Sequence, residues 1–262
     1  MSVADYKIVN ITDQNVENYD LLCYKSKKKS LGYLRKLEWF KEQYKAGLRI
    51  KLLLVRERKG LTSRGFIEYV PGEYSWRAID AAGYMVIHCL WVVGRNKGKG
   101  YGRKLIKECL NDAKDMNGVA VVTSEGTWLP GRKIFEKSGF EKVESVFSDI
   151  ELYVYRFSEN SALPRFNLDK FGKANRENGF VIFKSNQCPY TYASMNEIEE
   201  YAKEKDIPLE VSVISSSSEA QNVPHPYGTY CVVLDGQILS YRPIGKKGLQ
   251  KMDLRQQSTP WD

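Results

Sequence analysis

Apolar residues along the chain fall into short runs separated by turn-forming residues, a pattern typical of β-strands. We expect strands at residues 6–11, 51–56, 64–70, 84–93, 119–123, 142–147 and 151–157. The run at 84–93 is the most apolar and is interrupted by His88, so we expect it to be the most buried strand. It is far shorter than the roughly 20 residues of a membrane-spanning helix, and we expect no membrane anchor.

Other segments have a helical period. In residues 101–116 the apolar positions are Leu105, Ile106, Cys109, Leu110, Ala113 and Met116, and Asn117-Gly118 ends the helix. Residues 31–45 predict a helix whose wet side carries Arg35, Lys36, Lys41 and Lys45. A short helix is expected at 131–138, and Asp13 is expected to cap another that runs to about Leu22. The resulting β-α-α-β-β-β-α-β-α-β-β order predicts an α/β (α+β) unit over residues 1–157, a mixed sheet flanked by helices.

A smaller second unit follows. Ser, Asn, Pro and Gly mixed among charges predict that residues 158–178 form a linker that wraps the first unit. In residues 179–262 we expect strands at 179–184 and 209–214 with a helix between them that ends near Lys205. A hairpin turned by Asp235-Gly236 and a helix near Leu254 follow. A length of 262 residues fits two domains.

The formal net charge of +8 is unevenly distributed. Up to residue 157 the chain has 28 Lys and Arg against 19 Asp and Glu, and after it 12 against 13. A basic unit suits nucleic acid, an anionic membrane surface or a polyanionic cofactor. Because the lysines at 25–29 lack interleaved aromatic platforms, nucleic acid is the weaker expectation.

The cysteine pattern bears on the compartment. Cys23, Cys89, Cys109, Cys188 and Cys231 are odd in number, and no two of them have CxxC spacing. This pattern favours neither a disulfide framework nor a metal site, and it fits a reducing compartment. The first residues lack a basic leader followed by an apolar segment, so we expect a cytoplasmic protein.

The run at 84–93 leads directly into Gly94-Arg95-Asn96-Lys97-Gly98-Lys99-Gly100-Tyr101-Gly102, where the long helix begins. A strand, a Gly-rich turn and a helix N-terminus form an anion site, because free N–H groups point outward and glycines let a pyrophosphate approach. Arg95, Lys97 and Lys99 add full charges. The spacing is neither that of a P-loop nor that of a dinucleotide fingerprint. The alternative is a glycine turn with solvated lysines.

Residues 95–100 match the acetyl-CoA motif Arg/Gln-x-x-Gly-x-Gly/Ala. With its place before the long helix, and with the later Phe135-Glu-Lys-Ser-Gly-Phe140, the motif resembles the GNAT acetyltransferase superfamily over about residues 5–157. The resemblance implies direct transfer of acetyl from acetyl-CoA to an amine, with a splayed fourth strand binding the pantetheine arm. The implied cofactor site comprises Leu90, Trp91, Val92, Val93, Arg95, Asn96, Lys97, Gly98, Lys99, Gly100, Tyr101, Gly102, Trp128 and Phe135.

Two positions depart from the family pattern. The tyrosine that usually serves as the general acid falls on Phe135, and its partner asparagine falls on Trp128. A phenyl ring has no proton to donate, although the indole N–H of Trp128 is still a donor. Another group or water must therefore protonate the departing thiolate.

The candidate general bases are His88, on the strand before the loop, and Glu68, a carboxylate inside an apolar strand. A pKa near neutrality suits a histidine to this role. The alternatives are a core histidine hydrogen-bonded across the sheet and a glutamate that faces outward. Glu73, Trp76 and Arg77, after the third strand, are candidates for the acceptor pocket or are ordinary loop residues.

The βαβ-ββα order of residues 179–262 resembles the thioredoxin fold, and Cys188-Pro189-Tyr190-Thr191 resembles a glutaredoxin motif whose second cysteine is Thr191. At a helix N-terminus the dipole would stabilise the Cys188 thiolate, which makes Cys188 a candidate catalytic monothiol. The alternative is a redox-inactive motif used for docking or substrate recognition. Pro224 or Pro226 is the candidate cis-proline of such a fold. A GNAT unit with this tail resembles the YoaP-type acetyltransferases.

Three functions from different classes follow from these patterns. The first is an N-acetyltransferase that acts on a small-molecule or peptide amine. The second is a CoA-binding sensor or interaction protein without turnover. The third is a monothiol oxidoreductase centred on Cys188.

Overall fold

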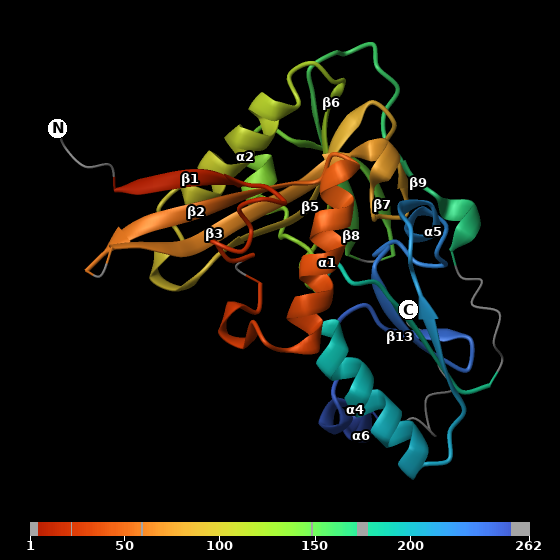
Figure 1. The fold of residues 1–262 in the computed structure, drawn as a ribbon. Helices are drawn as coiled ribbons and strands as arrows, with labels where there is room; N and C mark the ends of the chain where they lie inside the picture. The colour runs from red at the N-terminus through yellow and green to blue at the C-terminus, as the bar shows by residue number, and fades with distance from the viewer. Residues whose placement is uncertain (1–4, 22, 59, 148, 172–177, 253–262) are drawn as a thin grey trace.

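The computed structural model describes residues 5–21, 23–58, 60–147, 149–171 and 178–252 (Figure 1). Within these residues the chain forms a seven-stranded sheet, a four-stranded sheet and a two-stranded ribbon. In the part of the chain that is described, no helix is long and apolar enough to cross a membrane.

The large sheet has the order β1-β2-β3-β5-β6-β8-β7. Its strands are β1 (Tyr6–Ile11), β2 (Arg49–Glu57), β3 (Gly60–Pro71), β5 (Tyr84–Val92), β6 (Gly118–Ser124), β7 (Glu141–Val146) and β8 (Ile150–Arg156). Strands β5 and β6 are parallel, and the other neighbours are antiparallel. The predicted mixed sheet flanked by helices is confirmed.

Helices α1 (Leu31–Lys45) and α2 (Tyr101–Asp112) cover opposite faces of this sheet. Successive strand residues point to opposite faces, so Leu52 and Leu53 of β2 enter different cores. Leu52 packs in one cluster with Trp39 of α1, and Leu53 packs in another with Ile106 of α2. The short helix α3 (Lys133–Glu136) follows β6.

The second sheet has the order β11-β10-β12-β13. Its strands are β10 (Phe180–Lys184), β11 (Leu209–Val213), β12 (Tyr230–Leu234) and β13 (Gln237–Ser240). Its helices are α4 (Thr191–Glu204), α5 (Ser217–Gln221) and α6 (Lys246–Lys251). Strand β10 is parallel to β11 and antiparallel to β12. The predicted order is observed with α5 added, whereas Leu254 lies outside the described residues.

The predicted helix that Asp13 would cap is wrong over the residues described up to 21, where the chain forms successive turns. Thr12 and Asn15 exchange side-chain bonds, since each backbone N–H donates to the other's side-chain oxygen at 2.9 and 3.2 Å. Such local bonds compete with the helical ladder. Leu22 lies outside the described residues. The predicted cis-proline is wrong as well, because no described peptide bond is cis.

The two sheets share a hydrophobic core. Strand β9 (Arg165–Phe166), in the predicted linker, pairs with β4 (Ile79–Asp80) of the first unit. One cluster of buried side chains then joins Val122 and Leu152 of the large sheet to Ile182 and Val232 of the second. Figure 1 shows the second sheet beside one end of the large sheet, near the lower end of α1.

Candidate active site

Strands β5 and β6 run side by side for only part of their length. Parallel pairing joins residues 84–87 of β5 to residues 118–121 of β6. On its other side β5 remains paired with β3 as far as Val92. Backbone groups between Cys89 and Val92 therefore face β6 without a partner strand, which leaves a slot where an extended ligand arm can form β-type hydrogen bonds.

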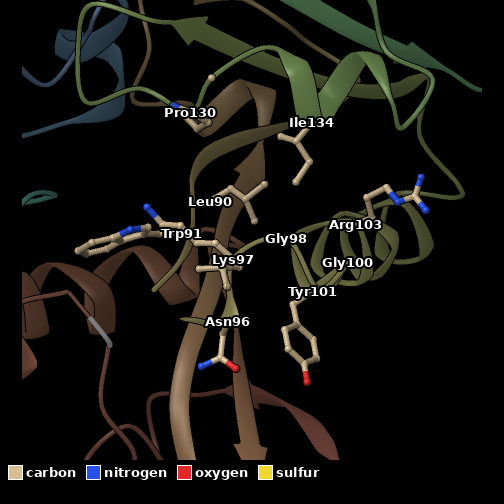
Figure 2. A pocket seen from close by; sticks show the side chains of 13 residues that line it. Leu90, Trp91, Asn96, Lys97, Gly98, Gly100, Tyr101, Arg103, Pro130 and Ile134 are labelled. Atoms are coloured by element: carbon tan, nitrogen blue, oxygen red, sulfur yellow. The ribbon is translucent and has the colours of Figure 1, made fainter. Parts of the chain in front are cut away.

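The slot opens into a groove of about 460 Å³ between β5, the start of α2 and the segment before α3. In Figure 2, Leu90 of β5 lies between Ile134 on one side and Gly98 and Gly100 on the other. The groove therefore runs from the split in the sheet to the N-terminus of the long helix.

Gly98 and Gly100 adopt positive φ angles of 78° and 76°. A Cβ added at either position would meet no protein atom within 4 Å, so both glycines border open space. Within the described chain, the backbone N–H groups of residues 98–103 have no backbone acceptor. Free N–H groups at a helix N-terminus attract anions, so the loop has the form of a phosphate cradle.

Most of the predicted cofactor residues line this groove: Leu90, Trp91, Val92, Asn96, Lys97, Gly98, Gly100, Tyr101 and Gly102. Val93, Arg95 and Lys99 do not line it. Arg95 instead lies close enough to Glu57 to help Arg64 lower the pKa of that carboxyl. Arg103 lies outside the acetyl-CoA motif at residues 95–100 and lines the groove as a further cation.

Phe135 and Trp128 lie apart from the groove. Phe135 is completely buried and packs against Phe140, with their ring centroids 5.3 Å apart. Trp128 is 46% exposed and lines a neighbouring cavity instead. Neither side chain is placed to protonate a thiolate in the groove.

The neighbouring cavity, of about 530 Å³, shares Leu90, Trp91, Pro130 and Gly131 with the groove. A group bound at the end of the groove beside Leu90 and Trp91 is therefore next to this cavity. The second unit contributes part of its wall through Gln187, Cys188, Pro189, Tyr190 and Tyr227. We call this space the acceptor cavity.

Glu68 and Lys36 form a buried ion pair in the acceptor cavity. The prediction of Lys36 on the wet side of its helix is wrong, since Lys36 is only 2% exposed. Its ammonium pairs with Glu68 and lies over the Trp39 ring, 4.2 Å from the centroid. Burial alone would raise the pKa of Glu68, but Lys36 and His88 outweigh it and hold that pKa at about 2. Glu68 is therefore an anion, and it does not face outward.

His88 lies at an irregularity in the pairing of β3 and β5. Glu68 pairs with Cys89 and Tyr69 pairs with Ile87, so His88 is an extra residue of the kind that a β-bulge re-aims. Its Nε2 accepts from the backbone N–H of Trp76 at 3.0 Å, and its Nδ1 lies 3.5 Å from Glu68 Oε1. Burial lowers the pKa of His88 to about 4, so the ring is neutral at pH 7. Because Nε2 is occupied and Nδ1 makes no hydrogen bond to a described residue, His88 is poorly placed to take a proton from an amine.

Arg77 joins the two units from within the cavity wall. Its Nη2 donates to the His88 carbonyl at 2.7 Å, and its Nη1 donates to Gln187 Oε1 at 3.2 Å. Gln187 Nε2 in turn donates to Glu68 Oε1 at 2.9 Å. Gln187 therefore bridges the guanidinium and the carboxylate across the boundary between the units.

The other two predicted loop residues do not line the cavity. Trp76 is buried, packs edge-on against Trp39 at 5.3 Å and contacts the site through its backbone, whose N–H donates to His88 and whose carbonyl accepts from Arg77. Glu73 is exposed and accepts from the backbone N–H of Gly83 at 2.8 Å. Of the three predicted residues, Arg77 alone contributes its side chain to the cavity.

Cys188 lines the acceptor cavity together with Cys23 and Cys89. The prediction of a dipole-stabilised Cys188 thiolate is wrong in direction. Burial raises the pKa of Cys188 and outweighs the opposing bonds from the Tyr190 and Thr191 N–H groups. Burial also raises the pKa of Cys89 to about 12 and raises that of Cys23. All three are neutral thiols at pH 7.

The Cys-Pro-Tyr-Thr segment, residues 188–191, packs against the first unit. The Tyr190 ring lies 4.6 Å from the Tyr24 ring and 5.3 Å from the Trp128 ring, measured between centroids. A Cβ at Gly32 of α1 would lie 2.3 Å from the Pro189 carbonyl oxygen. The motif therefore docks on the first unit through close contacts.

Comparisons with known proteins extend this description. No protein-family model matches the chain. The chain is 27% identical over 249 residues to a Bacillus subtilis (strain 168) protein named Uncharacterized N-acetyltransferase YoaP, covering 93% of this chain and 97% of that protein. The similarity therefore extends through both units.

Two solved structures are similar to part of the chain. An acetyltransferase from Thermus thermophilus is 14% identical, covers 60% of this chain and 100% of its own, and has a TM-score of 0.42. A PaiA N-acetyltransferase from Thermoplasma acidophilum, in complex with coenzyme A, is 15% identical, covers 59% and 100%, and has a TM-score of 0.39.

Proposed function

We propose that the chain is a GNAT-type N-acetyltransferase that transfers acetyl directly from acetyl-CoA to a primary amine. The observation that carries the proposal is the split between β5 and β6 beside the Gly98 and Gly100 cradle, which together fit a pantetheine arm and a pyrophosphate. The YoaP relative, an N-acetyltransferase by name, supports the same activity.

The groove residues fit acetyl-CoA in a specific way. Free N–H groups at the start of α2, with Lys97 and Arg103, would hold the phosphates. The unpaired backbone of Leu90 and Trp91 would hold the pantetheine arm and direct the thioester toward the acceptor cavity. When bound, acetyl-CoA supplies an activated acyl group that a neutral amine attacks with loss of the thiolate.

The chain's own contribution is positioning. Glu68 is the one carboxylate that lines the acceptor cavity among the described residues, and it accepts an N–H of the entering amine. Its pKa near 2 makes it a weak base, so water carries the proton away. Gln187 fixes the orientation of Glu68 through its hydrogen bond, and the neutral His88 ring lies beside the carboxylate. Free N–H groups of the split part of β5 stabilise the oxyanion, and water protonates the departing thiolate.

The second unit, residues 179–262 after a linker at 158–178, serves as a wall of the acceptor site in this account. Its strand order β11-β10-β12-β13 supports the resemblance to the thioredoxin fold. Burial and the raised pKa of Cys188 favour docking and substrate recognition over thiol redox chemistry. The rival monothiol oxidoreductase is correspondingly weakened.

The activity is tested by thiol release from acetyl-CoA in the presence of a panel of primary amines. We expect release that depends on both acetyl-CoA and an amine, and that is lost in the Gly98→Glu, Gly100→Glu variant. These glutamates would place side chains and negative charge in the cradle.

The same assay separates this proposal from the CoA-sensing alternative. A sensor would bind acetyl-CoA but release no thiol with any amine. A Cys188→Ser variant should retain thiol release, because the proposed transfer does not use that thiol. Complete loss of release in a folded Cys188→Ser protein would favour a catalytic thiol.

A further inference from the structure

The acceptor cavity carries an uncompensated buried cation. Lys36 and Glu68 neutralise each other, while Arg77 has no carboxylate partner among the described residues. The acceptors of its Nη1 and Nη2 are carbonyl groups, a side-chain amide and a hydroxyl, all neutral. Arg77 is only 3% exposed, and its Nε has no hydrogen-bond partner.

The other ionisable groups in the cavity do not balance this charge. His88 is neutral, and the thiols of Cys23, Cys89 and Cys188 are protonated at pH 7. The charged groups that line the described cavity therefore sum to one positive charge. A buried guanidinium without a counterion is costly, and a carboxylate is the partner that fits it best.

Apart from the Gln187 amide, the rest of the cavity lining is mainly apolar and aromatic. Phe66, Trp91, Trp128 and Leu129 line it from the first unit, and Tyr190 closes it from the second. The protonated thiols of Cys23, Cys89 and Cys188 add to this surface, since a neutral cysteine behaves as a small hydrophobe. A volume of about 530 Å³ falls within the range of small-molecule sites.

We propose that the acetyl acceptor is a free amino acid with a large apolar or aromatic side chain, its carboxylate drawn to Arg77 and its side chain held by the aromatic wall. The inference rests on the proposed acetyltransferase function and names the substrate class of that site.

The decisive comparison uses the expected product and its amide, which both lack a free amine and differ only in the carboxylate. N-acetyl-L-phenylalanine and N-acetyl-L-phenylalaninamide are titrated calorimetrically into the full-length protein saturated with CoA. We expect the acid to bind at least about tenfold more tightly than the amide, the size of one charge-assisted hydrogen bond. Equal binding, tighter binding of the amide, or binding of neither compound would overturn the proposal.

Paired variants then assign the preference to Arg77. Arg77→Lys keeps the charge and should retain the preference for the acid, whereas Arg77→Gln removes the charge and should abolish it. Both variants lose the forked guanidinium that bonds Gln187 and the His88 carbonyl together, so a purely structural role would affect them alike. Equal preference in the two variants would contradict the assignment.

A further variant tests the charge argument while Arg77 itself is unchanged, so the test does not depend on whether the Arg77 variants fold. In the Lys36→Met, Glu68→Gln double variant both members of the ion pair lose their charge, so the excess charge of the cavity is unchanged and the preference for the acid should persist. Its loss would contradict the charge argument. If CoA itself fails to bind, the proposed function fails, and the same titrations without CoA still test the carboxylate preference.

Discussion

At the scale of single residues, the site depends on one buried ion pair. Lys36 and Glu68 are 2% and 1% exposed, and each ion would be costly to bury alone. Glu68 Oε1 also accepts from Gln187 Nε2, so each carboxylate oxygen is held by one bond and keeps a lone pair for a further donor. The pair is therefore a positioned part of the site, unlike the exposed ion pairs on the surface.

Removing one partner of this pair should be strongly destabilising. We expect Lys36→Met or Glu68→Leu alone to lower the free energy of unfolding by about 3 to 5 kcal/mol. The first variant leaves the Glu68 carboxylate buried without its partner, and the second leaves the Lys36 ammonium so. The double variant should lose clearly less than the sum of the two. Urea unfolding of the four proteins measures this cycle, and strictly additive losses would contradict the pairing.

The two histidines predict how stability depends on pH. His88 and His225 are both buried, and burial lowers their pKa values from 6.5 to about 4 and about 3. Below pH 6.5 the two imidazoles bind protons in the unfolded chain but stay neutral in the folded chain, so acid favours unfolding. The free energy of unfolding should therefore fall by up to about 1.4 kcal/mol per pH unit for each histidine as the pH drops from 6.5 toward 4.

Urea unfolding at pH 7, 6 and 5 tests this dependence. The His225→Gln variant should show about half of the slope, because His88 alone then contributes. Below pH 4.5 the low pKa of Glu68 adds to the loss in the same direction. A free energy of unfolding that stays flat between pH 6.5 and 5 would show that the histidines are accessible to protons.

At the scale of elements, β5 carries three functions in nine residues. Its first half joins β6, the bulge at His88 turns that side chain toward Glu68, and its last residues leave β6 and line the groove. The first turn of α2 follows and faces the same groove. The groove and the neighbouring cavity are therefore adjacent because the last residues of one strand line both.

Close packing of α1 on the second unit gives a test at a single glycine. By helix propensity alone, Gly32→Ala should stabilise the helix by about 1 kcal/mol. The new Cβ, however, would lie 2.3 Å from the Pro189 carbonyl oxygen. We expect a net loss of about 1 to 3 kcal/mol in thermal or urea unfolding. Arg35→Ala, on the exposed side of the same helix, is the control and should stay within about 0.5 kcal/mol of wild type.

Local pattern predicted most elements and part of the site. The helix expected at residues 31–45 matches α1 at both ends, with Ser30 as its N-cap, and the cradle at Gly98 and Gly100 follows from a contiguous motif. Contacts such as Gln187 with Glu68 join residues 119 positions apart, and no local period encodes them. Lys36 was expected in solvent for the same reason, since its partner lies on a distant strand.

At the scale of the whole molecule, the two units share one hydrophobic cluster, which includes Val122 and Leu152 of the first and Ile182 and Val232 of the second. Separating the sheets would expose this apolar surface on both. We therefore expect calorimetry to give a single unfolding transition whose van't Hoff and calorimetric enthalpies agree. Two resolved transitions would mean that the units fold independently, and the acceptor cavity between them would then be a looser contact.

The central claim is that the groove beside the split in the sheet binds acetyl-CoA, and calorimetric titration tests it most directly. We expect wild type to bind at micromolar level and Gly98→Glu, Gly100→Glu to bind at least about a hundredfold more weakly. Gly60→Glu is the matched control, because Gly60 also has a positive φ and open space but lines neither cavity. Wild type that does not bind acetyl-CoA, or a cradle variant that binds it as well as the control, would contradict the account.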